Sequence, residues 1–305
     1  MAASTAGLAL GWNTSERRRW LRLPVDRRSL WTAWRGRIDV APLVGRWAVV
    51  FLDEVEVAVD LPGVFGLGAP VVVRCGWTDV SPPGSPEAAW RAGLLQDLLK
   101  RSARIACDST ATAREVGRLG FDLRTTTVVA PALPMVPPAV PAGPVGASPR
   151  LFVGSELGPE GVRELGALGL DVQRAPGFDD PRWPSLVGFG DVYVSGMAAT
   201  GMDPMIGVAM ALGAVAVVPR FEQVAELVID GRTGVTYDPA VPGDVLTVTQ
   251  ALAADCARRH EIAARSRDHV LRQCHPDRHA AAMADLIAAT LRTVTVVGRA
   301  PKGAT

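Results

Sequence analysis

Lysine is almost absent from this chain of 305 residues, occurring only at Lys100 and Lys302, so arginine carries nearly all of its positive charge. Lysine and arginine together number 32 against 31 acidic residues, which leaves a net charge of +1. A balance so close to neutral excludes a global field that would attract nucleic acid or another polyanion. The shortage of lysine beside abundant alanine, glycine, valine and proline is typical of a GC-rich bacterial genome.

Cysteine and long apolar segments are also scarce. The four cysteines, Cys75, Cys107, Cys256 and Cys274, are far apart and contain no C-x-x-C pair, which favours free thiols in a reducing compartment. The longest apolar run, residues 208–218, is shorter than the about 20 residues that cross a bilayer. A signal peptide has a basic segment followed by an apolar stretch, and the start of the chain has no such pattern. We therefore expect a cytoplasmic protein.

Short apolar runs alternate with helix-like stretches on both sides of a proline-rich segment. Residues 131–149 contain seven prolines, which suit neither a helix nor a central strand, and this segment is typical of a linker between domains. Valine-rich runs, as in strands buried on both faces of a parallel sheet, occur at 48–52, 70–75, 104–109, 126–131, 150–154, 171–175, 191–195 and 214–219. The pattern predicts two doubly wound α/β domains facing a cleft.

The predicted boundaries follow from this alternation. We expect an N-terminal Rossmann-like domain over residues 1–134, a linker over 135–149, a C-terminal Rossmann-like domain over 150–275, and a helix and tail over 276–305. Helices are predicted at 86–100, 111–119 and 159–168, and the chain from Asp244 to Leu291 is expected to be helical with a break at 274–279. Pro276 suits a first helical turn there. Ser109 or Thr112 is a candidate N-cap, with Gly120 as the C-terminal stop.

Three segments in register resemble the retaining nucleotide-sugar glycosyltransferases of the GT-B fold, the large group-1 family. They are RSARIACDSTATAREVGRLGF at 101–121, the stretch 175–219 that includes TGMDPMIGVAMALG, and QVAELVIDGRTGVTYDP at 223–239. The resemblance covers most of residues 100–280 and is looser in the first hundred. It implies an acceptor-side N-terminal domain and a donor-side C-terminal domain, with a nucleotide sugar as the substrate and no resident cofactor.

The family has E-G-F-G-x-x-x-x-E-A-M-A-x-G where this chain has residues 200–213. Thr200 stands where the family's first glutamate faces the donor sugar, and Val208 where its second binds the ribose hydroxyls. The backbone amides between them hold the diphosphate at a helix N-terminus in the family. The positions that agree with the family are Gly201, Ala209, Met210, Ala211 and Gly213.

The resemblance therefore implies a donor site with altered chemistry. Gly201 and Met202 would contact phosphate, and Asp203 would either reach the sugar or, as we favour, serve only as an acidic residue near a helix N-terminus. Ser155 follows Gly154 where the family has an arginine and, further on, a lysine. Arg220 or Arg74 would have to supply the missing positive charge, because a leaving diphosphate needs cations or N–H donors aimed at it.

Candidate catalytic residues in the N-terminal half follow predicted strands. Cys75 stands where the family commonly has a histidine, and Asp79 follows it closely. Asp53, with Glu54, comes directly after the run at 48–52, where it would face the cleft as a base or a ligand of an acceptor hydroxyl. A solvated acidic loop is an equally good interpretation of residues 53–60.

Two further clusters allow alternative interpretations. His275 and His279 are four residues apart and could share a helix face as a zinc pair, but no tight cysteine pair accompanies them, and we favour surface histidines and no metal. Residues 17–37 concentrate eight arginines and three tryptophans, which suits either a peripheral contact with an anionic membrane or a tryptophan core with solvated arginines.

Three functions remain open on these residues. The first is a divergent glycosyltransferase of the hexosyltransferase type, which transfers a sugar from a nucleotide sugar to an unknown acceptor. The second is an inactive pseudo-glycosyltransferase that assists or regulates an active partner enzyme. The third is a module that binds a sugar or nucleotide without turnover. We expect no nucleic-acid partner.

Overall fold

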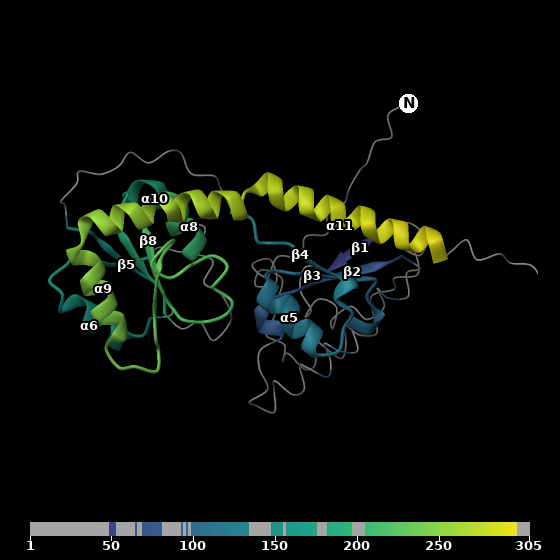
Figure 1. The fold of residues 1–305 in the computed structure, drawn as a ribbon, viewed down its shortest axis with the longest axis horizontal. Coiled ribbons are helices and arrows are strands. Elements are labelled where there is room, and N and C mark those ends of the chain that lie inside the picture. The colour runs from purple at the N-terminus through teal and green to yellow at the C-terminus, as the bar shows by residue number, and fades with distance from the viewer. Residues whose placement is uncertain are drawn as a thin grey trace, which may run out of the picture.

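The computed structural model describes residues 49–52, 65, 69–80, 93, 96, 99–133, 148–154, 157–175, 182–196 and 205–297. These form two units, each with its own parallel sheet (Figure 1). The two parallel sheets with flanking helices confirm the predicted α/β class. All eight strands expected from the valine-rich runs are present.

The N-terminal unit contains a parallel sheet of order β1-β2-β3-β4 within the described residues. Its strands and helices are β1 (Val50–Leu52), β2 (Val71–Cys75), η3 (Trp77–Asp79), β3 (Arg104–Cys107), α5 (Thr110–Arg118), η4 (Leu123–Thr125) and β4 (Thr126–Val128). Ser109, not Thr112, is the N-cap of α5, and its side chain accepts a hydrogen bond from the Thr112 amide. Gly120 follows this helix at φ 91°, as a C-terminal stop requires.

In the C-terminal unit, the residues that the structure describes form five parallel strands in the order β6-β5-β7-β8-β9. Its elements up to the last strand are β5 (Leu151–Val153), α6 (Pro159–Gly166), β6 (Val172–Arg174), α7 (Trp183–Leu186), β7 (Val192–Val194), α8 (Met205–Leu212), β8 (Val215–Pro219) and β9 (Val235–Tyr237). Helix α8 is buried along its whole length and packs on one face of the sheet, which explains why residues 205–212 are almost all apolar. The opposite face is covered by α6 and by apolar residues of 245–263, from the first two helices that follow β9.

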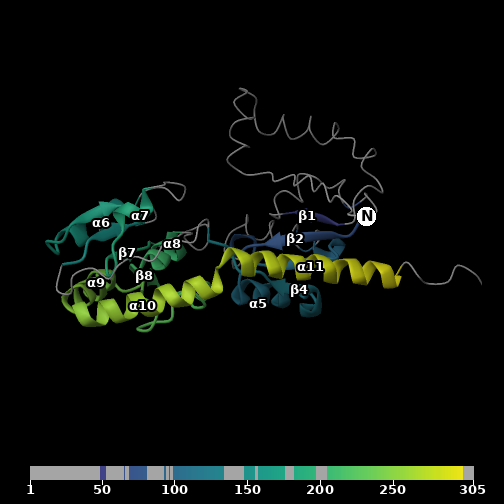
Figure 2. The ribbon, with the colours of Figure 1, turned by 90° about the horizontal axis from the view of Figure 1, so that it is seen from above.

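Three helices end the described chain: α9 (Asp244–Ala254), α10 (Cys256–Gln273) and α11 (Pro276–Val297). The helical region expected from Asp244 is interrupted at Asp255 as well as near 274–275, since Asp255 caps α10 through a hydrogen bond from the Arg258 amide. Figures 1 and 2 show α10 lying along the C-terminal unit and α11 continuing along the N-terminal unit.

Alternation along the N-terminal strands explains why α11 returns to this unit. Val71 and Val73 point into a core shared with α5, whereas Val72 and Ala106 point to the other face of the sheet. Leu286 of α11 is buried against that second face. The C-terminal helix therefore completes the hydrophobic core of the N-terminal unit.

Candidate functional site at the carboxyl ends of the strands

The order of the C-terminal sheet contains one reversal that locates a crevice. Numbered along the chain, the five strands lie in the order 2-1-3-4-5. The connection from β5 to β6 therefore runs toward one side of the sheet, and the connections from β7 to β8 and β9 run toward the other. Open α/β sheets of this order bind ligands outside the carboxyl ends of the two strands at the reversal. The segments that follow Val153 and Val194 therefore form the expected ligand-binding edge.

Backbone and side-chain hydrogen bonds order this edge. The Gly154 amide donates to the Val194 carbonyl at 2.9 Å, and the Ser195 amide donates to the Val217 carbonyl at 2.9 Å. The Tyr237 hydroxyl donates to the Ser195 carbonyl at 3.0 Å. The strand ends are thus tied together up to the point where the loop toward α8 begins.

Most of the predicted donor-binding residues come after β5 or β7 in the sequence. Thr200, Gly201, Met202 and Asp203 lie between β7 and α8, and Ser155 follows β5. All five lie outside the described residues, so their roles stay predictions.

Val208 is described, and it lies in the apolar core. It belongs to α8, is 5% exposed, and is part of the cluster that also contains Tyr193 and Met210. A hydrophobic side chain in this surrounding contributes packing, and it offers no hydrogen bond to a ribose hydroxyl. Its assignment to a donor site stays a prediction.

The two arginines proposed to replace the missing cations have different positions. Arg220 follows β8 directly, is exposed, and its Nε donates to Thr236 Oγ1 at 3.4 Å. Arg74 lies in β2 opposite Ala106, on the sheet face that α11 covers. Arg220 is therefore the arginine of the two at the carboxyl edge of the C-terminal sheet.

The carboxyl edge of the N-terminal sheet carries two carboxylates that bind backbone amides. Asp79 Oδ2 accepts from the Gly76 amide at 2.7 Å, and Asp108 Oδ2 accepts from the Trp77 amide at 3.3 Å. Thr112 Oγ1 also donates to Asp108 Oδ1 at 2.5 Å. These bonds join the loop after β2 to the loop after β3. Asp53, the third N-terminal candidate, lies outside the described residues.

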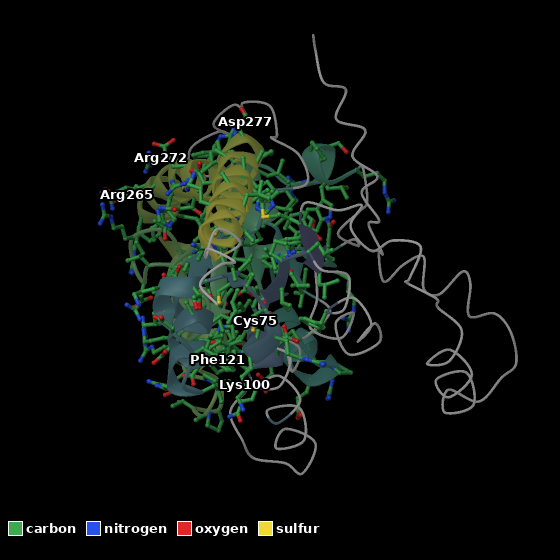
Figure 3. The ribbon with its side chains drawn as sticks, turned by 90° about the vertical axis from the view of Figure 1, so that its right-hand side faces the viewer. Cys75, Lys100, Phe121, Arg265, Arg272 and Asp277 are labelled. Carbon is green, nitrogen blue, oxygen red and sulfur yellow. The ribbon has the colours of Figure 1, made fainter. Side chains whose placement is uncertain are left out.

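Cys75 is buried beside Cys107, with which it pairs in register across β2 and β3. Burial, together with the nearby Asp79 and Asp108 carboxylates and the Cys107 thiol, raises the pKa of Cys75 well above its usual value. Burial, Asp108 and Asp79 also raise the pKa of Cys107, to about 12. Both thiols are therefore protonated at neutral pH, and nucleophilic sulfur chemistry requires the thiolate. Figure 3 shows Cys75 in the interior, while Arg265 and Arg272 project at the periphery.

Residues that the sequence reasoning passed over connect the two units. The Ala111 amide, in the first turn of α5, donates to Glu226 Oε1 at 3.2 Å. Arg114 and Glu222 form an ion pair at 3.2 Å, one helical turn further along. The carboxyl edges of the two sheets thus meet here, because α5 follows β3 and residues 222–226 follow β8. The N-cap pattern before α5 and the segment 223–239 both fall at this place in the sequence, but neither indicated that they would be in contact.

The histidines of the C-terminal helices have structural contacts. His279 Nδ1 lies 2.8 Å from the Ala130 carbonyl, and His275 Nδ1 accepts from the Asp277 amide at 3.2 Å. Among the described residues, no group of three or more His, Cys, Asp and Glu side chains could hold a metal ion. Within the same residues, no helix combines the length and apolar character that crossing a membrane requires.

Comparison with known proteins finds similar structures but no family profile or curated protein with a matching sequence. No protein-family profile matches the chain, and no curated protein matches it in sequence. The structure of HepE from Anabaena in complex with UDP and glucose matches with a TM-score of 0.64 at 14% identity, covering 82% of this chain and 81% of that one. Sucrose-phosphate synthase from Thermosynechococcus elongatus matches with a TM-score of 0.63 at 14% identity, covering 88% and 81%.

A third similar structure is that of the GtfA/B complex, with a TM-score of 0.58 at 12% identity, covering 80% of this chain and 57% of that chain. Two parallel sheets, a reversal of strand order in the second, and these neighbours define the class of fold as GT-B-like.

Proposed function

We propose that this chain binds a nucleotide sugar and is a divergent glycosyltransferase of the hexosyltransferase type. The observation that carries the proposal is the likeness to HepE with UDP and glucose over 82% of this chain. The 2-1-3-4-5 sheet order, which is part of this fold, places the expected ligand at the edge that carries Gly154 and Ser195. In this proposal the nucleotide sugar is a substrate, and the chain needs no resident cofactor.

The residues at this edge suit phosphate better than ribose. The first-turn amides of α8 and its dipole favour a diphosphate, with Gly201 and Met202 preceding the helix in the sequence and Arg220, after β8, as the cation at this edge of the sheet. Val208 lacks the carboxylate that would accept from a ribose diol, and a buried polar group left unpaired costs about 1–3 kcal/mol. We therefore propose a donor site that holds the diphosphate and has weakened contacts to the ribose and the sugar.

An inactive partner protein is the second candidate function. The likeness to a chain of the GtfA/B complex favours it, since that structure is of an assembly. The replacement of both family glutamates, at Thr200 and Val208, favours it as well. Co-purification of this chain with an intact glycosyltransferase that needs it for full activity would support this function over the first.

A peripheral contact with anionic membrane is a further part of the proposal. It depends on residues 17–37, whose eight arginines and three tryptophans suit an interface with anionic lipid. Sedimentation with anionic and with neutral liposomes tests it, and equal failure to bind both would refute it.

Thermal unfolding of the purified chain with UDP-, GDP- and dTDP-sugars tests the donor site. A ligand at a hundred times its dissociation constant stabilises the folded state by about 2.7 kcal/mol, so one sugar nucleotide should raise the melting temperature. The variant Gly201→Trp should abolish the shift. Gly166→Trp is the matched control, because Gly166 is exposed, has nothing within 4 Å of an added Cβ, and ends α6 at the opposite edge of the sheet. Absence of a shift with every donor would overturn the proposal.

A further inference from the structure

The two units are joined on one side by buried backbone and on the other by exposed polar groups. On the first side, the Leu133 amide donates to the Cys274 carbonyl at 2.8 Å, and Leu133 is buried in the core of the C-terminal unit. The chain crosses there twice, between β4 and Leu133 and again between α10 and α11. Because the chain itself passes between the units here and Leu133 is buried, this is the fixed side of the junction.

The second side consists of the contact between Glu226 and α5. The first amides of an α-helix have no partner within the helix, and the Ser109 side chain accepts only from Thr112. The Ala111 amide is instead occupied by the Glu226 carboxylate of the other unit. A carboxylate at a helix N-terminus is further stabilised by the helix dipole.

Glu226 is held in place from its own unit. His269 Nε2, on α10, lies 2.8 Å from the Glu226 carbonyl oxygen, which fixes the backbone from which the carboxylate extends. The neighbouring ion pair is weaker, because the side chains of Arg114 and Glu222 are 56% and 58% exposed. Exposed pairs of this kind contribute little to stability. This side of the junction therefore consists of one part-buried hydrogen bond, held in place from its own unit, and one exposed ion pair.

We propose that Glu226 and the Ala111 amide form an interdomain latch that holds the carboxyl edges of the two sheets together and releases by rotation about the 133–274 crossing. The latch depends only on residues of this chain and holds whether or not the protein turns over a sugar donor. The exposed ion pair of Arg114 and Glu222 lies beside the latch and adds little to it.

Amide hydrogen exchange with single-residue resolution tests the latch on the full-length chain. Because the Ala111 amide has no partner within the helix, its protection reports the Glu226 contact directly. We expect Glu226→Ala to speed its exchange about fivefold to tenfold. Glu226→Gln, which keeps an acceptor oxygen and loses the charge, should have an intermediate effect. Glu222→Ala is the matched control and should leave the Ala111 rate within about twofold of the original.

Two further readouts separate latch opening from local unfolding. The Ile229 amide, which donates to Thr233 Oγ1 at 2.8 Å, should keep its protection in Glu226→Ala if residues 221–233 stay folded. Small-angle scattering should show a larger radius of gyration for Glu226→Ala, and also for Arg114→Glu, which places like charges opposite Glu222. An unchanged Ala111 rate in Glu226→Ala, or an unchanged radius in both variants, would overturn the proposal.

Discussion

The hydroxyl of Tyr237 donates a hydrogen bond to the backbone carbonyl of Ser195, with the two oxygens 3.0 Å apart. The bond spans from the end of β9 to the residue after β7, across the intervening β8. Tyr237 is buried, and burial raises the pKa of its hydroxyl to about 12, so the group is a permanent donor at neutral pH. It fixes the strand end from which the proposed donor-binding loop departs.

Tyr237→Phe should lower the free energy of unfolding by about 1–2 kcal/mol, because it leaves the buried Ser195 carbonyl without this donor while the ring packing stays. Urea denaturation followed by circular dichroism measures the change. Thr247→Val is the control, since Thr247 donates to the Gly243 carbonyl at an exposed position. If Tyr237→Phe is no less stable than Thr247→Val, the bond does not order this edge.

Alkaline pH should destabilise the protein through its buried thiols and Tyr237. The pKa of Cys75 is raised above its usual value, and the pKa of Cys107 and of Tyr237 is raised to about 12. In the unfolded chain these groups lose their protons at lower pH, so the unfolded state binds fewer protons and stability falls as pH rises from about 8.5 toward 12.

Each group that is ionised only in the unfolded state contributes a slope of up to about 1.4 kcal/mol per pH unit. Cys107→Ala should flatten this slope at pH 9 to 11, as measured by urea denaturation at several pH values. A slope identical to that of the original protein would show that Cys107 is not protonated in the folded state over this range.

The thiols should react in an order set by burial. Cys75, Cys107 and Cys274 are buried, whereas Cys256 is partly exposed. With an aromatic disulfide reagent at neutral pH, we expect Cys256 to react first and the buried thiols to react at the rate of unfolding. Mass spectrometry of the labelled peptides identifies the site. Early labelling of Cys75 would contradict its burial and would show an accessible thiol at this predicted catalytic position.

Gly213 and Gly120 provide a matched pair for backbone strain, because both have φ 91°. An added Cβ at Gly213 would lie 2.6 Å from Phe189 Cδ2, whereas one at Gly120 would meet nothing within 4 Å. Gly120→Ala should therefore cost about 1 kcal/mol, the strain of a left-handed conformation alone. Gly213→Ala should cost more by about 1–3 kcal/mol, since Phe189 must move in a packed core. Equal melting temperatures for the two variants would show that Phe189 yields freely.

Local patterns in the chain were sufficient for the strands and for several helix ends. Val71, Val73 and Val215 occur in continuous apolar runs because both faces of their sheets are covered, and the runs predict β2 and β8 directly. Pro276 begins α11 as expected. The break at Asp255 was missed, because an aspartate inside a helix-like stretch looks the same in sequence whether or not it caps a new helix.

Contacts between residues far apart in the chain could not be predicted from local sequence patterns. The bond between Ala111 and Glu226 joins positions 115 apart in the chain, and an exposed glutamate has no periodicity that would indicate its partner. The burial of Val208 was equally hidden, since a valine can replace a site glutamate in a pocket or in a core.

The sequence by itself determined the parallel α/β class, because strand burial on two faces imposes continuous apolar runs that can be read locally. Tertiary structure alone decided which strand ends lie together. It set the reversal of strand order between β5 and β7, brought the Tyr237 hydroxyl to the Ser195 carbonyl, and brought the Glu226 carboxylate to the first turn of α5. These relationships arise from chain crossings and domain packing, which bring together residues whose types carry no record of their partners.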